Sequence, residues 1–576
     1  MTSTRDDIME ASEIAPAPSR APSGSRQPTI ATVDSGDEQT FPRLTPAEIS
    51  RVAPLGQVRS YVPGEAIRRV GDRGHGLTVV LDGEVEITRP GLDGGRERVV
   101  VIGPGGFLGE LSQLTGRPSL TDTCAIGAVT ALRLTPGGLR TLMIAESELG
   151  GRIMQALILR RAEMVRSHAG GLVVIGPSRR AAVLRLETFL TRNGHPWLPL
   201  DPDDDMARAL LARRRIASRA WPVVICPSGD VLSNPTIDQL ARCIGLLSPI
   251  DGERLYDVAI VGAGPAGLAT AVYAGSEGLS AIALDAKAFG GQAGASARIE
   301  NYLGFPTGVS GMALMAGAYD QAQKFGVEIA IPEEVVGLAP GDDGEAKQLR
   351  LASGEVVRAR TVVIASGADY RRLAVARICE FETTAVHYWA SPIEARLSEG
   401  ADVVLVGAGN SAGQAAVFLA SYARSLAILV RGAGLEASMS RYLIDRIGAL
   451  PNIEVIPHAE VAALEGHDGV LEAVRWRSAD GAERRRPTTQ LFCFIGADAN
   501  ARWLSGSRVA LDPRGFVLTG PAAGPGERQP LETSRDAVFA IGDVRSGSTK
   551  RVSAAAGEGA QVVAAIQAHL ARSRVA

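Results

Sequence analysis

The chain has 576 residues, of which 45% are hydrophobic, and a formal net charge of −3 at pH 7. This length exceeds what one hydrophobic core can organise and predicts roughly three or four domains. The near-neutral charge gives no bulk attraction to nucleic acid, and no apolar run approaches the ~20 uncharged residues of a membrane helix. We therefore expect a multidomain cytoplasmic protein with no nucleic-acid partner and no membrane span.

The N-terminal segment, residues 1–40, is rich in Ser, Pro, Ala and Thr and has no hydrophobic stretch of the kind found in secretory signals. We expect it to be disordered, because it cannot bury enough apolar surface to fold. The cysteines are widely spaced and form no CxxC pair, no zinc spacing and no disulfide framework. They are expected to be mostly buried small hydrophobes. They are Cys124, Cys226, Cys243, Cys379 and Cys493.

Residues 41–168 are predicted to form a small β-barrel followed by a helix. Short Val/Ile-rich runs alternate with Gly/Pro turns, as in LTVVLDGEVEITRPG and RERVVVIGPGGFLGE. The segment 149–170, LGGRIMQALILRRAEMVRSHAG, then places apolar residues at helical spacing among arginines.

This barrel resembles the cyclic-nucleotide-binding domain, a β-jelly roll whose phosphate-binding cassette corresponds to GGFLGELSQLTGRPSLT, 105–121. The resemblance implies that backbone N–H groups near Gly109 and one Arg hold a cyclic phosphate, while Glu110 takes the ribose hydroxyl. In the family the Arg follows the Pro of this segment, whereas here Arg117 precedes Pro118. Two interpretations stay open: a regulatory barrel without a ligand, and a functional barrel with an altered choice of cyclic nucleotide.

Residues 169–248 are predicted to run strand, helix, strand, strand, helix: GLVVIG, RRAAVLRLETFLTRNG, WLPLD, AWPVVIC and TIDQLARCIGL. This order is similar to a thioredoxin/glutaredoxin-like domain, with Trp221-Pro222 in the place of the cis-Pro. The redox pair is missing, because IGPSRR after the first strand has no Cys. Cys226 follows the Pro-led strand and is interpreted as core packing. We expect a docking or spacer module without redox cysteines.

The segment YDVAIVGAGPAGLATAVYA is an apolar strand, a glycine turn and an Ala-rich helix. Asp285 ends the next strand about twenty residues on, which completes the dinucleotide-binding fingerprint. In that fingerprint Gly262 makes the tight turn and Gly264 lets a pyrophosphate approach the backbone. Gly267 permits close packing of helix and strand, and Asp285 bonds the ribose hydroxyls.

The same pattern recurs in ADVVLVGAGNSAGQAAVFLA, 401–420. Two fingerprints in one chain imply two dinucleotides, normally a flavin and a nicotinamide. Arg431 follows the second strand of this unit and is placed to pair a 2′-phosphate, which favours NADPH over NADH. The predicted nicotinamide-nucleotide contacts are Gly407, Gly409, Asn410, Ser411, Ala412 and Arg431.

Residues 254–576 resemble the low-molecular-weight thioredoxin reductase family. Besides the glycine turns, the matching segments are GGQAGASARIENYLGFP, TVVIASGA and VFAIGDVRSGSTKRVSAAAGEGA. The resemblance implies that Gln292 and Asn301 lie against FAD, that Asp543 holds the ribityl chain, and that 551–553 meets the isoalloxazine. The FAD contacts expected from the fingerprint and the resemblance are Gly262, Gly264, Pro265, Ala266, Gly267, Asp285, Gly291, Gln292, Asn301, Gly542, Asp543, Arg551, Val552 and Ser553.

The resemblance also implies the domain plan. An FAD-binding domain, 252–370 and 494–576, is interrupted by an inserted NAD(P)-binding domain, 371–493, with hinges near 368–372 and 490–496. A homodimer is expected. The fold class is therefore a cyclic-nucleotide-binding-type jelly roll, a thioredoxin-like α/β domain and two Rossmann-like α/β domains.

The family's CxxC, within SYCATCDG, is in register here with HYWASPIE, so Trp389 and Pro392 hold the two cysteine positions. Hydride transfer from NAD(P)H to FAD needs no thiol, so we predict an oxidoreductase that passes electrons to another acceptor. Candidates are a ferredoxin-like carrier, a quinone, oxygen or a thioredoxin-like protein. Trp389 is either a cover for the flavin or ordinary interdomain packing. The alternatives are a nucleotide- or redox-responsive sensor with little turnover, and thioredoxin-disulfide reduction by a non-standard route.

Overall fold

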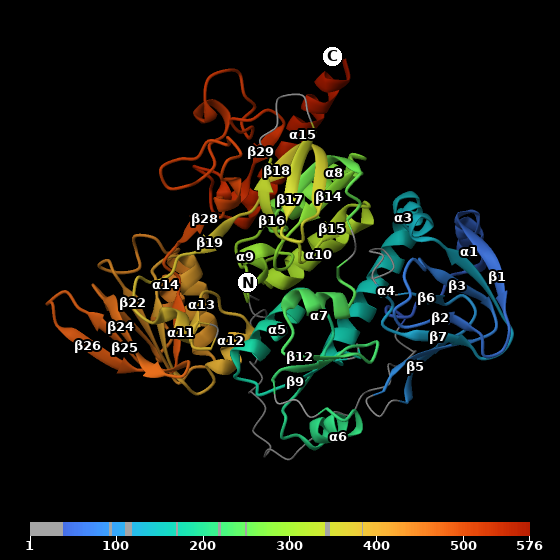
Figure 1. Cartoon of the computed structure of the whole chain (residues 1–576), viewed down its shortest axis with the longest axis horizontal. Coiled ribbons are helices and arrows are strands. Elements are labelled where there is room, and N and C mark those ends of the chain that lie inside the picture. The colour runs from blue at the N-terminus through green and yellow to red at the C-terminus, as the bar shows by residue number, and fades with distance from the viewer. Residues whose placement is uncertain are drawn as a thin grey trace, which may run out of the picture.

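The computed structural model describes residues 38–91, 95–109, 118–168, 171–216, 220–247, 250–339, 346–382 and 384–575. Figure 1 shows an N-terminal barrel at the right, a middle domain below the centre and two further α/β units at the top and left. We call the upper unit the first Rossmann domain (255–364 with 502–575) and the left unit the second Rossmann domain (378–493), which is described together with the crossings at 368–370 and 497–499.

The barrel consists of two four-stranded antiparallel sheets, ordered β1-β8-β3-β6 and β2-β7-β4-β5. Val79, Phe107 and Leu132 form a core with Ile153 and Leu157 of the following helix, which confirms the predicted barrel and helix. Its helices and strands are α1 (Pro46–Val52), η1 (Ala53–Leu55), β1 (Gly56–Tyr61), β2 (Ala66–Arg68), β3 (Thr78–Asp82), β4 (Val85–Pro90), β5 (Arg96–Ile102), β6 (Phe107–Leu108), β7 (Asp122–Ala125), β8 (Val129–Leu134), α3 (Pro136–Ala145) and α4 (Ser147–Arg166).

The middle domain has one sheet, ordered β10-β9-β11-β12, in which β9 and β10 are parallel and β11 is antiparallel to β9. The predicted strand–helix–strand–strand–helix order is confirmed, and the Trp221-Pro222 peptide is cis as expected. The prediction omitted α6 and β12. The elements are β9 (Val173–Ile175), α5 (Ala181–Arg192), β10 (Leu198–Leu200), α6 (Asp205–Arg213), β11 (Val223–Ile225), β12 (Val231–Ser233) and α7 (Ile237–Cys243).

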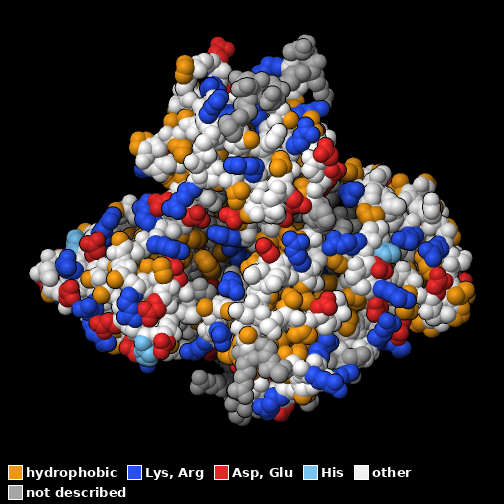
Figure 2. All heavy atoms as spheres, in the orientation of Figure 1, with side chains coloured by type: hydrophobic (Ala, Val, Ile, Leu, Met, Phe, Trp, Pro, Cys, Tyr) orange, Lys and Arg blue, Asp and Glu red, His pale blue; other side chains and the backbone are white. Residues whose placement is uncertain are grey.

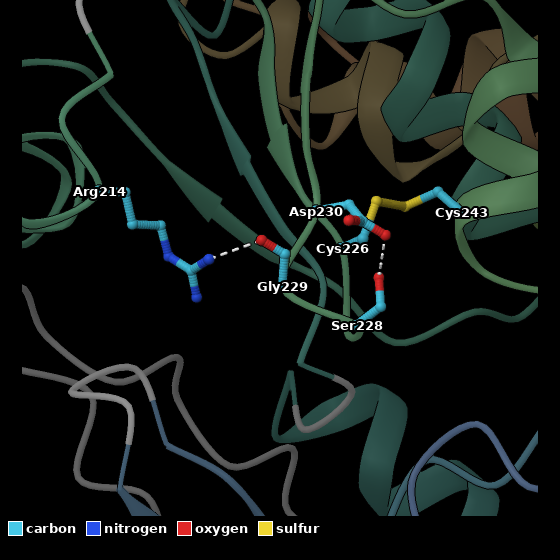
Figure 3. The surroundings of a disulfide bond; sticks show 6 residues. All are labelled: Arg214, Cys226, Ser228, Gly229, Asp230 and Cys243. Atoms are coloured by element: carbon cyan, nitrogen blue, oxygen red, sulfur yellow. Dashed lines mark hydrogen bonds between the residues drawn. A yellow bond between two sulfur atoms is a disulfide. The ribbon is translucent and has the colours of Figure 1, made fainter.

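Cys226 and Cys243 form a disulfide, so the expectation that they are unpaired core residues was wrong. Cys226 directly follows β11, and Cys243 is the last residue of α7. Strand β12 pairs antiparallel with β11 and is followed by α7, and Figure 3 shows the disulfide that joins Cys226 to Cys243. The pair is 17 residues apart, and this spacing alone did not reveal it.

The first Rossmann domain has a sheet ordered β15-β14-β13-β18-β17-β16, with β29 paired in parallel to β18. Helices α8 and α15 pack over one face, where Val562 and Ile566 join a core that includes Ala271. The elements are β13 (Leu255–Val261), α8 (Pro265–Ser276), β14 (Ala281–Leu284), α9 (Gly291–Gly294), α10 (Gly311–Lys324), β15 (Glu328–Ala330), β16 (Val335–Leu338), β17 (Lys347–Leu351), β18 (Val356–Ile364), η2 (Arg502–Leu504), η3 (Gly520–Ala523), β29 (Val538–Ala540), η4 (Gly542–Val544) and α15 (Val552–Val575).

The second Rossmann domain has a parallel sheet, β20-β27-β21-β22-β23, and an antiparallel one, β24-β25-β26. The two chain crossings between the Rossmann domains pair as an antiparallel ribbon, β19 with β28. The elements are β19 (Ala368–Tyr370), α11 (Ile378–Phe381), β20 (Val386–His387), α12 (Pro392–Leu397), β21 (Asp402–Val406), α13 (Asn410–Ala420), β22 (Ser425–Val430), α14 (Arg441–Gly448), β23 (Ile453–Pro457), β24 (Glu460–His467), β25 (Val470–Arg477), β26 (Glu483–Pro487), β27 (Gln490–Cys493) and β28 (Ala497–Ala499).

Helix α5 of the middle domain faces both Rossmann domains. At its C-terminal end, Asn193 donates from Nδ2 to the carbonyl of Lys287 in the first Rossmann domain, at 3.2 Å. Nearer its middle, Glu187 is only 7% exposed and lies within electrostatic range of Arg396 on α12. Burial raises the pKa of the Glu187 carboxyl to about 7, against the opposing attraction of Arg396.

We predict that Glu187→Gln stabilises the protein at pH 8 more than at pH 5. Because the folded-state pKa lies above the unfolded value, the folded state binds the extra proton between about pH 4.5 and 7. Wild-type stability therefore falls as pH rises through that window, by up to roughly 3 kcal/mol, and the neutral amide removes this loss. Thermal unfolding midpoints at both pH values measure it. Exposed Glu399→Gln is the control, and equal gains at both pH values for Glu187→Gln contradict the prediction.

Candidate dinucleotide-binding sites

The first glycine turn lies between β13 and α8. Gly262 has φ +109°, and a Cβ there would lie 2.2 Å from the carbonyl oxygen of Ala365. A Cβ at Gly267 would lie 1.8 Å from the carbonyl oxygen of Gly262. The protein's own backbone therefore demands glycine at both positions. At Gly264 the situation differs, because a Cβ would meet only the Cα of Gly291, at an ordinary 3.8 Å.

The second glycine turn, between β21 and α13, repeats this pattern. Gly407 has φ +144°, and a Cβ there would lie 2.5 Å from the carbonyl oxygen of Phe494. A Cβ at Gly409 would meet no atom within 4 Å among the described residues. Each turn thus has a middle glycine, Gly264 or Gly409, that internal packing does not require. This leaves room for a group to approach the start of the helix closely, as the dinucleotide-binding pattern requires of its phosphate.

Asp285 is held beside the first turn. One carboxylate oxygen accepts from the backbone N–H of Ala263 at 3.0 Å, and the other from Lys287 at 2.9 Å and Ala288 at 3.1 Å. A carboxylate has about four acceptor positions, so it retains capacity for a ribose hydroxyl. The structure thus places Asp285 where the sequence pattern predicts it.

Several of the other predicted FAD contacts lie near the same turn. A Cβ at Gly542 would be 3.0 Å from the Cβ of Ala266, which follows Pro265 at the start of α8. Burial raises the pKa of the neighbouring Asp543 carboxyl. Gln292 donates from Nε2 to the carbonyl of Ala368, at the crossing between the Rossmann domains.

Most of the remaining predicted FAD and nicotinamide contacts are exposed or half-buried. Asn301 is exposed and does not line the cavity described below. Arg551 and Ser553 are exposed and Val552 is half-buried, where α15 begins. In the second Rossmann domain, Ser411 and Arg431 are exposed and Ala412 is buried. Asn410 accepts from the backbone N–H of Ser440 at 2.7 Å.

A cavity of about 260 Å³ lies between the two Rossmann domains. Gln292 of the first domain, Ser411 of the second and Tyr370 of the crossing line it together with Trp389. The Tyr370 and Trp389 ring centroids are 6.4 Å apart, and Trp389 donates from its indole N–H to Glu394 at 3.0 Å. Burial raises the pKa of Tyr370 to about 12, so its phenol is neutral. Tyr370 is not recognisable as a site residue from the sequence, because only the fold brings it to Trp389.

The segment in register with the CxxC, residues 387–394, contains the start of helix α12. Pro392 begins α12, and Ser391 and Glu394 form its capping box. Nearby, Cys493 is buried, which raises the pKa of its thiol to about 12, and Cys379 is exposed on α11. Across the described residues, Cys226–Cys243 of the middle domain is the one disulfide, and no free thiols form a vicinal pair.

In the barrel, Gly109 is the one predicted cyclic-nucleotide residue that the structure describes, and Glu110 and Arg117 lie outside the described residues. The Gly109 carbonyl accepts from Nη1 of Arg160 at 3.0 Å. Arg160, which the sequence analysis missed, is 7% exposed, and burial lowers the pKa of its guanidinium to about 9. A buried cation therefore supports the start of the cassette.

Two strand–turn–helix units, each with a glycine that packing among the described residues does not require, match the dinucleotide-binding pattern. Residues 256–559 match the family described as pyridine nucleotide-disulphide oxidoreductase, and residues 58–146 match the cyclic nucleotide-binding domain. The chain belongs to the pyridine nucleotide-disulphide oxidoreductase family, in its thioredoxin reductase-like branch, and carries an N-terminal cyclic nucleotide-binding domain. In the described part of the chain, no helix combines the length and apolarity needed to cross a membrane.

Three similar proteins illustrate this relationship. The bifunctional thioredoxin reductase/thioredoxin of Mycobacterium leprae is 30% identical over 54% of this chain and 65% of its own length. The NADPH-dependent thioredoxin reductase 3 of Arabidopsis thaliana is 33% identical over 54% and 57%. The thioredoxin reductase structure from T. acidophilum aligns with TM-score 0.50 and 28% identity, over 55% of this chain and 98% of that one. The chain thus spans less than two thirds of the length of the two curated relatives.

We predict that Gly409→Ala and Gly264→Ala separate the two sites. Neither added Cβ clashes with the protein, so each variant should fold with a near wild-type unfolding midpoint. Gly409→Ala should weaken NADPH binding by about tenfold or more and leave FAD content unchanged, because a methyl blocks close phosphate approach. Gly264→Ala should lower the FAD content and leave the affinity for NADPH unchanged. Calorimetry with NADP⁺ and flavin absorbance measure both, and each variant is the other's control. Unchanged affinities in both would contradict the assignment of the turns.

Proposed function

We propose that the chain is an FAD-dependent NAD(P)H oxidoreductase whose electron acceptor is not a resident CxxC dithiol. Family membership supports the reaction class. Gly264 and Gly409, where an added Cβ would clash with no described atom at the start of a helix, support two dinucleotide sites in one chain. The absence of a thiol at Trp389 and Pro392 supports the second half of the proposal.

The residues divide into two binding sets. At the first turn, the α8 N-terminus and Gly264 face the FAD pyrophosphate, and Asp285 accepts from the ribose hydroxyls. Asp543 and Gln292 extend this site toward the crossing between the domains. At the second turn, the α13 N-terminus faces the nicotinamide dinucleotide, and Arg431 favours a 2′-phosphate and hence NADPH. When bound, the nicotinamide supplies a hydride and the flavin accepts it.

The interdomain cavity is the strongest support for this proposal, because residues of both predicted dinucleotide sites line it. Gln292 from the FAD set and Ser411 from the nicotinamide set share this cavity of about 260 Å³. Its wall holds the indole of Trp389 where the family has a thiol. In this proposal electrons leave for a small or protein acceptor from outside: a ferredoxin-like carrier, a quinone, oxygen or a thioredoxin-like protein. A homodimer is part of the same proposal.

Anaerobic titration tests this function. The purified holoprotein should bleach near 450 nm with one equivalent of NADPH per FAD, more slowly with NADH, and without new titratable thiols. Gly409→Ala is the matched control and should bleach slowly with both nucleotides. Bleaching with neither nucleotide, despite bound FAD, would overturn the proposal. Consumption of two equivalents with two new thiols would place Cys226–Cys243 on the electron path and overturn the absence of a resident dithiol.

The barrel supports a second candidate function, because its match to the cyclic nucleotide-binding domain covers residues 58–146. In this version the protein is a nucleotide-responsive sensor with slow turnover. Saturating cAMP or cGMP should raise the unfolding midpoint of the full chain, since a ligand at a hundred times its Kd stabilises its domain by ~2.7 kcal/mol. AMP serves as the control. No shift with either cyclic nucleotide removes the ligand-sensing version.

A further inference from the structure

Arg192, the last residue of α5, reaches from the middle domain to the first glycine turn. Its Nη2 donates to the carbonyl of Gly291 at 2.7 Å. Gly291 in turn lies against Gly264, because a Cβ at Gly291 would be 3.0 Å from the Cα of Gly264. Gly291 is therefore the one residue between the Arg192 guanidinium and Gly264, the glycine at which an added Cβ would meet no clash.

The charge of Arg192 is incompletely satisfied by the described residues. Its Nε is buried and has no hydrogen-bond partner there. Burial lowers the pKa of the guanidinium, and Asp285 is the leading opposite influence. Asp285 already accepts from backbone N–H groups on both oxygens. Arg192 as a whole is half-buried, and an anion beside it would give the buried Nε the partner that it lacks among the described residues.

The end of α5 is also held in place independently of this charge. Asn193 donates to the carbonyl of Lys287, which lies between Asp285 and Gly291 on the same loop. Figure 2 shows Lys and Arg side chains, interspersed with Asp and Glu, around the hollow at the centre of the molecule, where the middle domain and the two Rossmann domains meet.

We propose that Arg192 of the middle domain is part of the FAD site, where its guanidinium binds the diphosphate of the dinucleotide held at the Gly264 turn. This rests on the proposed function, which places FAD at that turn. The middle domain then has a chemical role, because it supplies a cation to the FAD site of the first Rossmann domain. FAD affinity and docking of the middle domain are accordingly coupled.

The test uses the full chain after FAD removal. FAD affinity is measured by quenching of flavin fluorescence for wild type, Arg192→Gln, Arg192→Lys and Arg185→Gln. Arg185 lies on the same helix and is exposed, so it controls for charge alone. ADP and adenosine are then compared as competitors, because only ADP carries the diphosphate. Unfolding midpoints of all four proteins establish that they are folded.

Arg192→Gln should weaken FAD binding roughly 10- to 100-fold, because a charge-assisted hydrogen bond to phosphate is lost. Its ADP affinity should fall by a similar factor while its adenosine affinity stays within about twofold. Arg192→Lys should lose less FAD affinity than Arg192→Gln, and Arg185→Gln should keep the wild-type affinity. Where Arg192→Gln does not fold, the Lys variant decides by the same comparison of ADP with adenosine.

Two results would overturn the inference alone: wild-type FAD affinity in Arg192→Gln, or equal losses for ADP and adenosine, which mean that Arg192 acts only through domain packing. A wild-type protein that binds no FAD overturns the proposed function and this inference with it. The outcomes are therefore distinguishable.

Discussion

The approach of each helix to the strand before it is the constraint on which both Rossmann domains depend. The distance of 1.8 Å between a Cβ at Gly267 and the Gly262 carbonyl leaves no room for any side chain. Because the turn is this tight, the N-terminus of α8 points at a fixed place, and Asp285 and Gly291 are arranged around it. In the second Rossmann domain the turn is equally tight, because a Cβ at Gly407 would lie 2.5 Å from the carbonyl oxygen of Phe494. The backbone of each glycine turn thus fixes the position of the helix N-terminus, and the surrounding side chains are arranged around that position.

Helix α5 connects this geometry to the rest of the protein. One end contacts the loop of the first Rossmann domain through Asn193, and its middle faces α12 of the second through Glu187. A ligand that changes the relative position of the Rossmann domains must therefore change contacts made by the middle domain. By thermodynamic reciprocity, a change in the contacts of the middle domain alters the relative position of the two Rossmann domains.

The sequence predicted features that depend on local spacing and missed those that depend on the path of the chain. Gly262, Gly264 and Gly267 fall within one turn, so their pattern was sufficient, and strands such as β9 and β11 were recognisable from short apolar runs. The disulfide was missed, because Cys226 and Cys243 meet only through β12 and α7. Tyr370 and Arg192 were missed for the same reason: each meets its partners across a domain boundary, and no sequence periodicity records such a contact. Glu187 has the sequence context of an ordinary charge on an amphipathic helix.

The first Rossmann domain is discontinuous, and this has a consequence for how the protein is made. Strand β29 pairs with β18 across the whole inserted second domain, and α15 packs on α8. During synthesis the barrel and middle domain leave the ribosome first and fold as units, whereas the sheet that carries the first glycine turn waits for its last strand. The end of α5 is then already formed when the 287–291 loop arrives. The first Rossmann domain is therefore completed beside a middle domain whose chain precedes it, and a chain truncated before 538 would leave that middle domain beside an incomplete sheet.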